Sequence, residues 1–123
     1  MANPNIVNVA SIYGSTSYLI PANTSATTWT ALTPSAGTVN KVNNIVASNV
    51  TGSAVAVTVA INSAAAGAGT NYRISYQISV PANASLIVVD KSTSIYVGEA
   101  QSIVVTVGTG SAIELTSSFE AIT

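Results

Sequence analysis

The feature that most constrains the fold of this chain is a two-residue alternation of apolar with small or polar side chains. Between Ala54 and Ile61 every second residue is Val or Ile, and the others are Ala or Thr. From Tyr72 to Val80 large apolar residues alternate with Arg, Ser and Gln. Successive side chains of a β-strand point to opposite faces, so this period predicts strands. We expect the first strand to be covered on both faces and the second to have one face in water.

The same pattern recurs along the chain in short runs bounded by Gly, Pro or Asn. The small-residue run Ser63–Asn71 predicts a flexible loop, because Gly67 and Gly69 oppose a helix there. No segment keeps an apolar period of 3.6 residues, so no helix longer than two turns is expected. The further predicted strands are Ile6–Ile12, Ser17–Ile20, Thr27–Leu32, Val39–Ser48, Leu86–Asp90, Ser94–Val97, Ile103–Val107 and Ala112–Ile122.

Eight or nine short strands with frequent turns predict an all-β fold, an antiparallel β-sandwich of jelly-roll or Greek-key type. The length of 123 residues fits one domain. We therefore expect an N-terminal arm over residues 1–5 and a single β-sandwich domain over residues 6–123. The arm residues Ala2, Asn3, Pro4 and Asn5 are polar, stiffened by Pro and too few for a strand of their own. They are predicted to form an interface by reaching a neighbouring molecule.

Two short sequences occur twice at nearly the same spacing. PANTS at Pro21–Ser25 is echoed by PANAS at Pro81–Ser85, and TGSA at Thr51–Ala54 recurs at Thr109–Ala112. The echo has two interpretations. It could mark two related halves, each a Greek-key-like unit, or it could be coincidence in a chain so rich in Ala, Ser, Thr and Asn.

Charge is scarce in this chain. It has three basic and four acidic residues, which make 6% of the sequence against about 25% in an ordinary soluble domain. Because soluble monomers usually carry more charge, we expect much of this surface to be covered by partners, including further copies of the chain. Three basic residues cannot form the footprint that nucleic acid needs, so no nucleic-acid partner is expected.

Membrane association and export are also not expected. No apolar stretch approaches the roughly 20 residues of a spanning helix. The opening residues MANPNIVNV lack the basic and apolar regions of a signal peptide, so no Sec-type export is predicted. Cysteine is absent, which removes disulfides and Cys-based zinc sites from consideration.

The residues that usually carry catalysis are missing or scattered. There is no His, and Asp90, Glu99, Glu114 and Glu120 form no acidic pair or Asp-rich run. Ser and Thr have no His to activate them, and no phosphate-binding loop is present. The sequence therefore predicts no catalytic residue, no cofactor, no metal ligand and no enzymatic activity. The carboxylates are interpreted as solvated turn and strand-edge charges.

The large aromatic residues leave two interpretations open. Trp29 could be the core aromatic of a small sandwich, or it could join exposed tyrosines in stacking on sugar rings. As a side chain suited to contacts, Trp29 is also predicted, with the arm, at an interface. The tyrosines are Tyr13, Tyr18, Tyr72, Tyr76 and Tyr96.

Two runs, ANPNIVNVASIYG near the N-terminus and ISVPANASLIVVDKSTSIYVGEAQSIVVTV in the C-terminal half, resemble a family of small virion structural proteins. The family belongs to tailed phages, particularly those that infect marine cyanobacteria, and the resemblance spans nearly the whole chain. In that family a strand ending in Val-Pro-Ala leads into a LIVV-K-TSIY strand pair and then an acidic turn. Here the turn reads Gly98-Glu99-Ala100-Gln101, which departs from the acidic Gly or Asp pair of the pattern.

The resemblance implies a virion structural protein, made in the host cytoplasm. It points most directly to a capsid decoration, or cement, protein that binds the outer surface of the major capsid lattice and stabilises the head. A homotrimer is then expected, because decoration proteins commonly sit where three capsid subunits meet. A neck, tail or fibre-associated protein is the alternative within the same class. A carbohydrate-binding module for host attachment is the alternative from another class.

Overall fold

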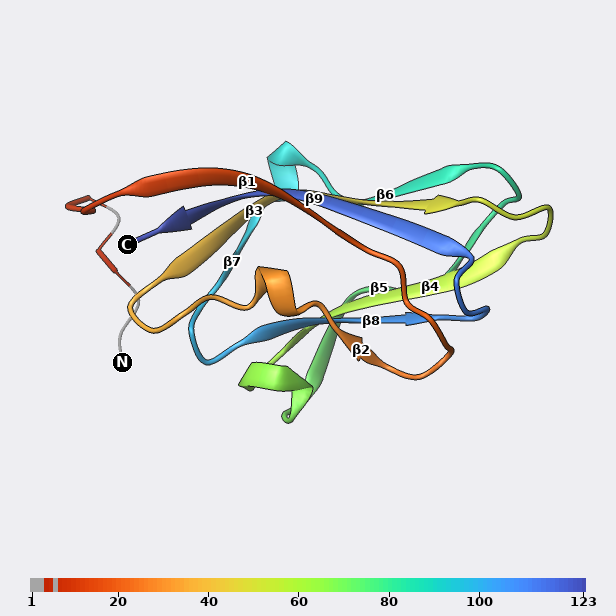
Figure 1. The fold of residues 1–123 in the computed structure, drawn as a ribbon, viewed down its shortest axis with the longest axis horizontal. Helices are drawn as coiled ribbons and strands as arrows, with labels where there is room; N and C mark the ends of the chain where they lie inside the picture. The colour runs from red at the N-terminus through yellow and green to blue at the C-terminus, as the bar shows by residue number, and fades with distance from the viewer. Residues whose placement is uncertain (1–3, 6) are drawn as a thin grey trace.

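The computed structural model describes residues 4–5 and 7–123, whose strands form two antiparallel sheets packed face to face (Figure 1). Sheet A comprises β1 (Ile12–Leu19), β9 (Ile113–Ile122), β3 (Val39–Asn49), β6 (Ser85–Val89) and β7 (Ile95–Val97). Sheet B comprises β2 (Thr27–Thr28), β8 (Ser102–Val107), β4 (Val55–Asn62) and β5 (Asn71–Val80). Three single turns of 3₁₀ helix, η1 (Thr30–Leu32), η2 (Ala65–Gly67) and η3 (Lys91–Thr93), lie in connections. Over the described residues the prediction of an all-β sandwich without a long helix is confirmed.

The strand order is that of a jelly roll. Along the same side of β3, β6 pairs with Ile45–Ser48 and β7 with Asn40–Val42, so the two behave as one strand interrupted by η3. Counted that way, sheet A orders the strands first, eighth, third and sixth, and sheet B orders them second, seventh, fourth and fifth. Each sheet thus alternates strands from both halves of the chain, which is the double Greek key of jelly rolls.

A single apolar core lies between the sheets. Its residues come from the inward faces of the strands, at every second position, as the two-residue period predicts. From β4 the inward residues are Val55, Val57 and Val59, whereas Ala60 on the other face is also buried and Thr58 is half-buried. The expectation that β4 is covered on both faces therefore holds best at its C-terminal end.

The first strand begins later than predicted. Residues 7–11 of the predicted strand Ile6–Ile12 form a turn and bends, and β1 runs from Ile12 through Tyr13-Gly14 to Leu19. All eight residues of β1 pair with β9 without a register shift, from Ile12 opposite Ile122 to Leu19 opposite Leu115. Gly14 shows no left-handed backbone angle, so it continues the strand and does not end it. The end of β9 at Ile122, distant in sequence, coincides with the start of β1 at Ile12.

The predicted strand Thr27–Leu32 is mostly wrong. Only Thr27–Thr28 pairs with β8, and the chain then turns into η1, with the Leu32 amide donating to the Trp29 carbonyl at 3.1 Å. The Trp29 amide still donates to the Ile103 carbonyl at 2.8 Å, which fixes the residue over the end of β8. The turn lets both Trp29 and Leu32 enter the core, which a straight strand would not allow, since their spacing is odd.

Strand β5 does not have the single wet face that its alternation predicts. Its register against β4 shifts twice, so that Tyr76 and Gln77 both lie opposite Thr58, and Ile74 lies between the partners of Val59 and Ala60. Such bulges break the inside-outside alternation of a strand. The bulge turns Tyr76 to the outer face, where it is 58% exposed. Tyr72 and Ile78, which lie in register opposite Ile61 and Val57, are also exposed, at 62% and 43%.

The echoed sequences occupy corresponding connections of the two halves. The two PAN segments form the β1–β2 and β5–β6 connections, and the two TGSA segments form the β3–β4 and β8–β9 connections. All four connections lie at the same end of the sandwich (Figure 1), and hydrogen bonds join them in two pairs. Ser111 N donates to Pro21 O at 2.8 Å, and Asn83 N donates to Thr51 O at 3.2 Å. Each PAN segment thus contacts the TGSA segment of the other half, which favours two related halves over coincidence.

Candidate assembly interface

Trp29 is a core residue, so its assignment to an interface is wrong. Its side chain is 1% exposed, and its Nε1–H donates to Ser17 Oγ at 3.0 Å. A ring buried in this way presents no surface to a partner and none to a sugar.

Of the predicted arm residues, Ala2 and Asn3 lie outside the described part of the chain. Pro4 is half-buried and Asn5 is exposed, with Asn5 Oδ1 accepting from Val7 N at 3.0 Å.

The carboxylates are dispersed over sheet A and its connections. Glu114 is exposed on β9, Glu120 accepts from Asn43 Nδ2 at 3.3 Å, and Glu99 accepts from Gly37 N at 2.7 Å. Within residues 4–5 and 7–123 no three His, Cys, Asp or Glu side chains gather in a way that could hold a metal ion. Nor does the described part contain a helix long and apolar enough to cross a membrane.

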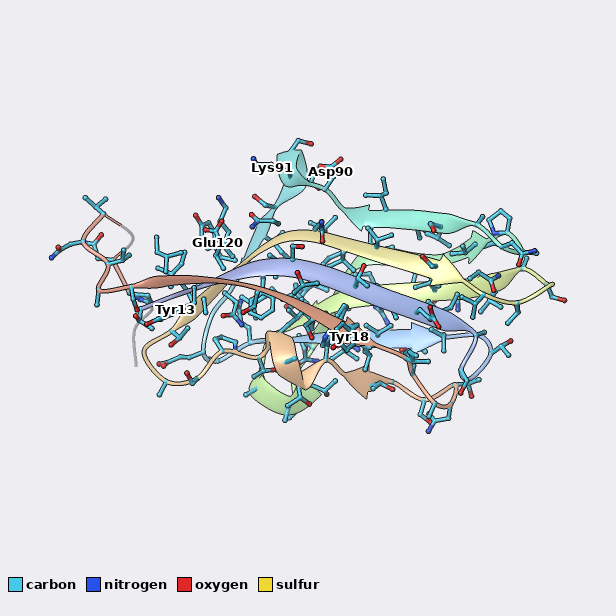
Figure 2. The ribbon with its side chains drawn as sticks, turned by 45° about the horizontal axis from the view of Figure 1, so that its top comes forward. Tyr13, Tyr18, Asp90, Lys91 and Glu120 are labelled. Carbon is cyan, nitrogen blue, oxygen red and sulfur yellow. The ribbon has the colours of Figure 1, made fainter. Side chains whose placement is uncertain are left out.

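Asp90 has a defined structural role as the cap of η3 (Figure 2). Its carboxylate accepts from Ser92 Oγ at 2.6 Å, from Ser92 N at 2.9 Å and from Thr93 N at 3.1 Å. The Ser92 hydroxyl above all, helped by the hydrogen bonds from Thr93, holds the pKa of Asp90 below its ordinary value of 3.8. This cap is what interrupts the sixth strand of the jelly roll and separates β6 from β7.

The cap should open in acid. Because the folded pKa of Asp90 is depressed, ionised Asp90 stabilises the turn above pH 3.8, and this stabilisation is lost as the pH falls through the folded pKa. We expect the amide signals of Ser92 and Thr93 to move together in an acid titration followed by nuclear magnetic resonance. In Asp90→Asn, which can still cap, the two signals should not titrate. Titration of these amides in that variant would contradict the assignment.

The edges of the two sheets differ in how well they are protected against pairing. An exposed strand edge is a template for another strand, and proteins usually block it with charge, bulges or interruptions. The β5 edge has two bulges and Arg73, and the β6–β7 edge is broken by η3 with Asp90 and Lys91. The β2 edge has only two residues.

Strand β1 has none of these protections. Its sequence IYGSTSYL contains no charge and no Pro, and it pairs with β9 alone and without a bulge. Its first five residues are exposed. Tyr13 and Tyr18 lie at separate places along the strand (Figure 2), and they are 66% and 79% exposed. The β1 edge is thus the strand edge of the described chain best suited to accept a partner strand.

The outer face of sheet A continues this surface. Register places Tyr18, Thr116, Val46 and Ile87 in one row across β1, β9, β3 and β6. Tyr18 and Ile87, at the ends of the row, are 79% and 64% exposed. Sequence reasoning missed this surface, because the row joins four strands that are distant in sequence. The one local signal was the lack of charge in IYGSTSYL.

Comparison of the chain with protein-family models, with curated proteins and with solved structures found no match.

Proposed function

We propose that this protein is a structural component of a phage virion, and most specifically a capsid decoration protein. In this role it binds the outer surface of the major capsid lattice as a homo-oligomer, with a trimer favoured, and stabilises the head. The observation that carries the proposal is the charge-poor surface with an unprotected β1 edge, which suits a domain covered by neighbours. The resemblance of ANPNIVNVASIYG and of the LIVV-K-TSIY region to small phage virion proteins supports the same role.

The jelly roll is compatible with this role and does not by itself select it, since the fold also serves lectin-like and other proteins. A neck, tail or fibre-associated position remains the alternative within the same class. The carbohydrate-binding alternative loses one of its two supports, because Trp29 is buried in the core, whereas the tyrosines are exposed.

In the proposed trimer the β1 edge of each copy contacts a different surface of the next copy, because two β1 edges that pair with each other would close a dimer. The main-chain groups on the free side of this strand would supply the hydrogen bonds, and exposed Tyr13 and Tyr18 would add apolar contact. Residues 6–11 separate the N-terminal arm from β1, so we expect the contact of the arm with a neighbour near the beginning of the same edge. Oligomerisation and capsid binding are therefore expected to weaken together when the edge is blocked.

Blocking the edge with charge tests this proposal. The double variant Ser15→Lys and Thr16→Lys places two cations on the exposed part of β1 and leaves the core unchanged. By light scattering we expect the wild type to be an oligomer and the variant a monomer with an unchanged circular dichroism spectrum. Added to heads that lack the protein, the wild type should bind and raise their melting temperature, and the variant should not.

A matched control is Ser79→Lys on β5, an exposed position at an edge that bulges already protect. This variant should assemble and bind as the wild type does. A wild-type monomer would contradict the β1 contact, and heads that gain neither bound protein nor stability would contradict the decoration role.

A further inference from the structure

A hollow of about 230 Å³ lies on the outer face of sheet B, away from β1. Its floor is formed by the outward residues of two central strands, Thr58 and Ala60 of β4 and Val104 and Thr106 of β8. Ala60 and Val104 are only 2% and 5% exposed although they face away from the core. The floor is therefore sunken between two raised walls and combines small apolar groups with two hydroxyls.

The first wall is the bulged part of β5. Without the bulge Tyr76 and Gln77 would point to opposite faces, yet both line the hollow. Gln77 has a φ of 48°, a left-handed conformation that is uncommon outside Gly. Its backbone N–H donates to Thr58 Oγ1 at 2.9 Å. Backbone strain of this kind collects at functional sites, where it aims side chains.

The connection with η2 lies next to the floor, where Gly67 is close to the Val104 side chain, and buried polar side chains hold this connection in place. Asn62 Oδ1 accepts from Ala64 N at 3.0 Å and from Gly69 N at 2.8 Å, and Ser102 Oγ donates to Ala64 O at 2.7 Å. Asn62 Nδ2 also donates to Asn71 Oδ1 at 2.7 Å. Asn71 lines the hollow. Because its side-chain oxygen accepts this bond, its Nδ2–H groups are left to donate to a ligand.

The hollow contains the one charge of its sheet. The strands of sheet B and the η2 connection include no acidic residue and no cation other than Arg73, which lines the hollow. The Arg73 guanidinium lies over the Tyr76 ring, with Cζ 5.2 Å from the ring centroid, which holds it at the rim. Within the described residues no carboxylate pairs with it. All four acidic residues lie on sheet A or its connections, so the hollow is a locally positive place on a net negative protein.

We infer that this hollow binds an acidic saccharide, with a sugar carboxylate on Arg73 and the ring over the floor. A guanidinium recognises carboxylates through paired hydrogen bonds. Ala60 and Val104 leave a narrow apolar strip at the bottom of the hollow, and the exposed Tyr76 ring adds apolar surface at its side for the C–H face of a sugar. Thr106, Asn71 and Gln77 surround it with donors and acceptors for ring hydroxyls. This activity adds to the structural role proposed above and does not depend on it.

The test is a titration of the ¹⁵N-labelled wild-type protein with trigalacturonate, with maltotriose as a neutral trisaccharide of equal length. Trigalacturonate should shift the amide signals of β4, β5 and β8 around the hollow, and maltotriose should bind at least tenfold more weakly. Arg73→Gln should weaken trigalacturonate binding at least tenfold. Thr106→Val, which keeps the side-chain shape and removes a hydroxyl, should weaken it several-fold.

The matched control is Lys41→Gln, which removes one cation from sheet A and should leave trigalacturonate affinity unchanged. Equal binding by maltotriose would overturn the acidic part of the inference. Equal binding by acetate or by a triglutamate peptide would overturn the saccharide part and assign the hollow to carboxylates in general. Shifts confined to sheet A, or no shifts, would overturn the site.

Discussion

Trp29→Ala is expected to reduce the free energy of unfolding by about 3–5 kcal/mol, the usual effect of removing a buried aromatic side chain. Trp29 is the largest fully buried side chain, and it lies where the chain crosses from sheet A to sheet B. Its ring N–H donates a hydrogen bond to Ser17 Oγ, and its backbone N–H donates one to the Ile103 carbonyl. Its removal opens a cavity and leaves both sheets less well packed. Because small domains have only about 5–15 kcal/mol of stability in total, a large part of that stability should be lost.

Urea denaturation at one fixed protein concentration measures this effect, since assembly would otherwise shift the apparent stability. Trp29→Phe should cost less than Trp29→Ala, because it keeps most of the packing and loses the hydrogen bond to Ser17. The control is Tyr72→Ala, which truncates a 62% exposed aromatic side chain outside the proposed β1 contact and should change stability by no more than about 0.5 kcal/mol. Similar losses in Trp29→Ala and Tyr72→Ala would contradict the core assignment.

Asn62→Ala is expected to have the second largest effect, about 2–3 kcal/mol. The side chain is 1% exposed, and its amide makes four hydrogen bonds, two accepted from the loop amides of Ala64 and Gly69 and two donated, to Gly69 O and Asn71 Oδ1. Truncation leaves these groups without their partner, and a buried polar group without a partner costs about 1–3 kcal/mol.

The same substitution should release the η2 connection. Hydrogen exchange of the Ala64 and Gly69 amides should accelerate far more than exchange in the core strands, and denaturation should give the stability change. Asn43→Ala is the control, since it removes a single 3.3 Å bond to Glu120 from a half-buried position and should cost less than about 1 kcal/mol. Unchanged exchange at Ala64 and Gly69 in Asn62→Ala would contradict the role of Asn62 as the clamp of this loop.

The run of Ser63–Asn71 illustrates what composition could not predict. Its small residues and glycines predicted a flexible loop, whereas Asn62 and Ser102, both outside the low-complexity run, fix its backbone. The signal was therefore in the flanking polar residues. A buried Asn or Ser at the end of a strand looks in sequence like any other turn residue.

Strand positions were largely predictable where the alternation is strong. The predicted Val39–Ser48, Ile103–Val107 and Ala112–Ile122 each agree with β3, β8 and β9 to within one residue at either end. The first strand was misplaced because Ile6–Ile12 alternates apolar and polar residues much as a true strand does. Only pairing with β9 distinguishes this segment from β1. The bulges of β5 could not be predicted, since a bulge is a mismatch in residue count between two strands.

The candidate surfaces depend on that same long-range pairing. Arg73 was visible in the sequence as one of three basic residues, but not as the one charge of a whole sheet. Trp29 shows the opposite case. Its identity suggested both a core and a contact role, and burial decides between them. Composition, in contrast, predicts a surface covered by partners, because seven charges are few for the surface of a domain of this size.

The most direct test of the decoration role is the number and position of copies on the particle. Quantitative mass spectrometry of purified virions, read with a reconstruction of the head, measures both. The proposal predicts hundreds of copies on the outer surface of the capsid, as trimers at positions where three capsid subunits meet. A few copies confined to the neck, tail or fibres, with none on the head, would contradict it.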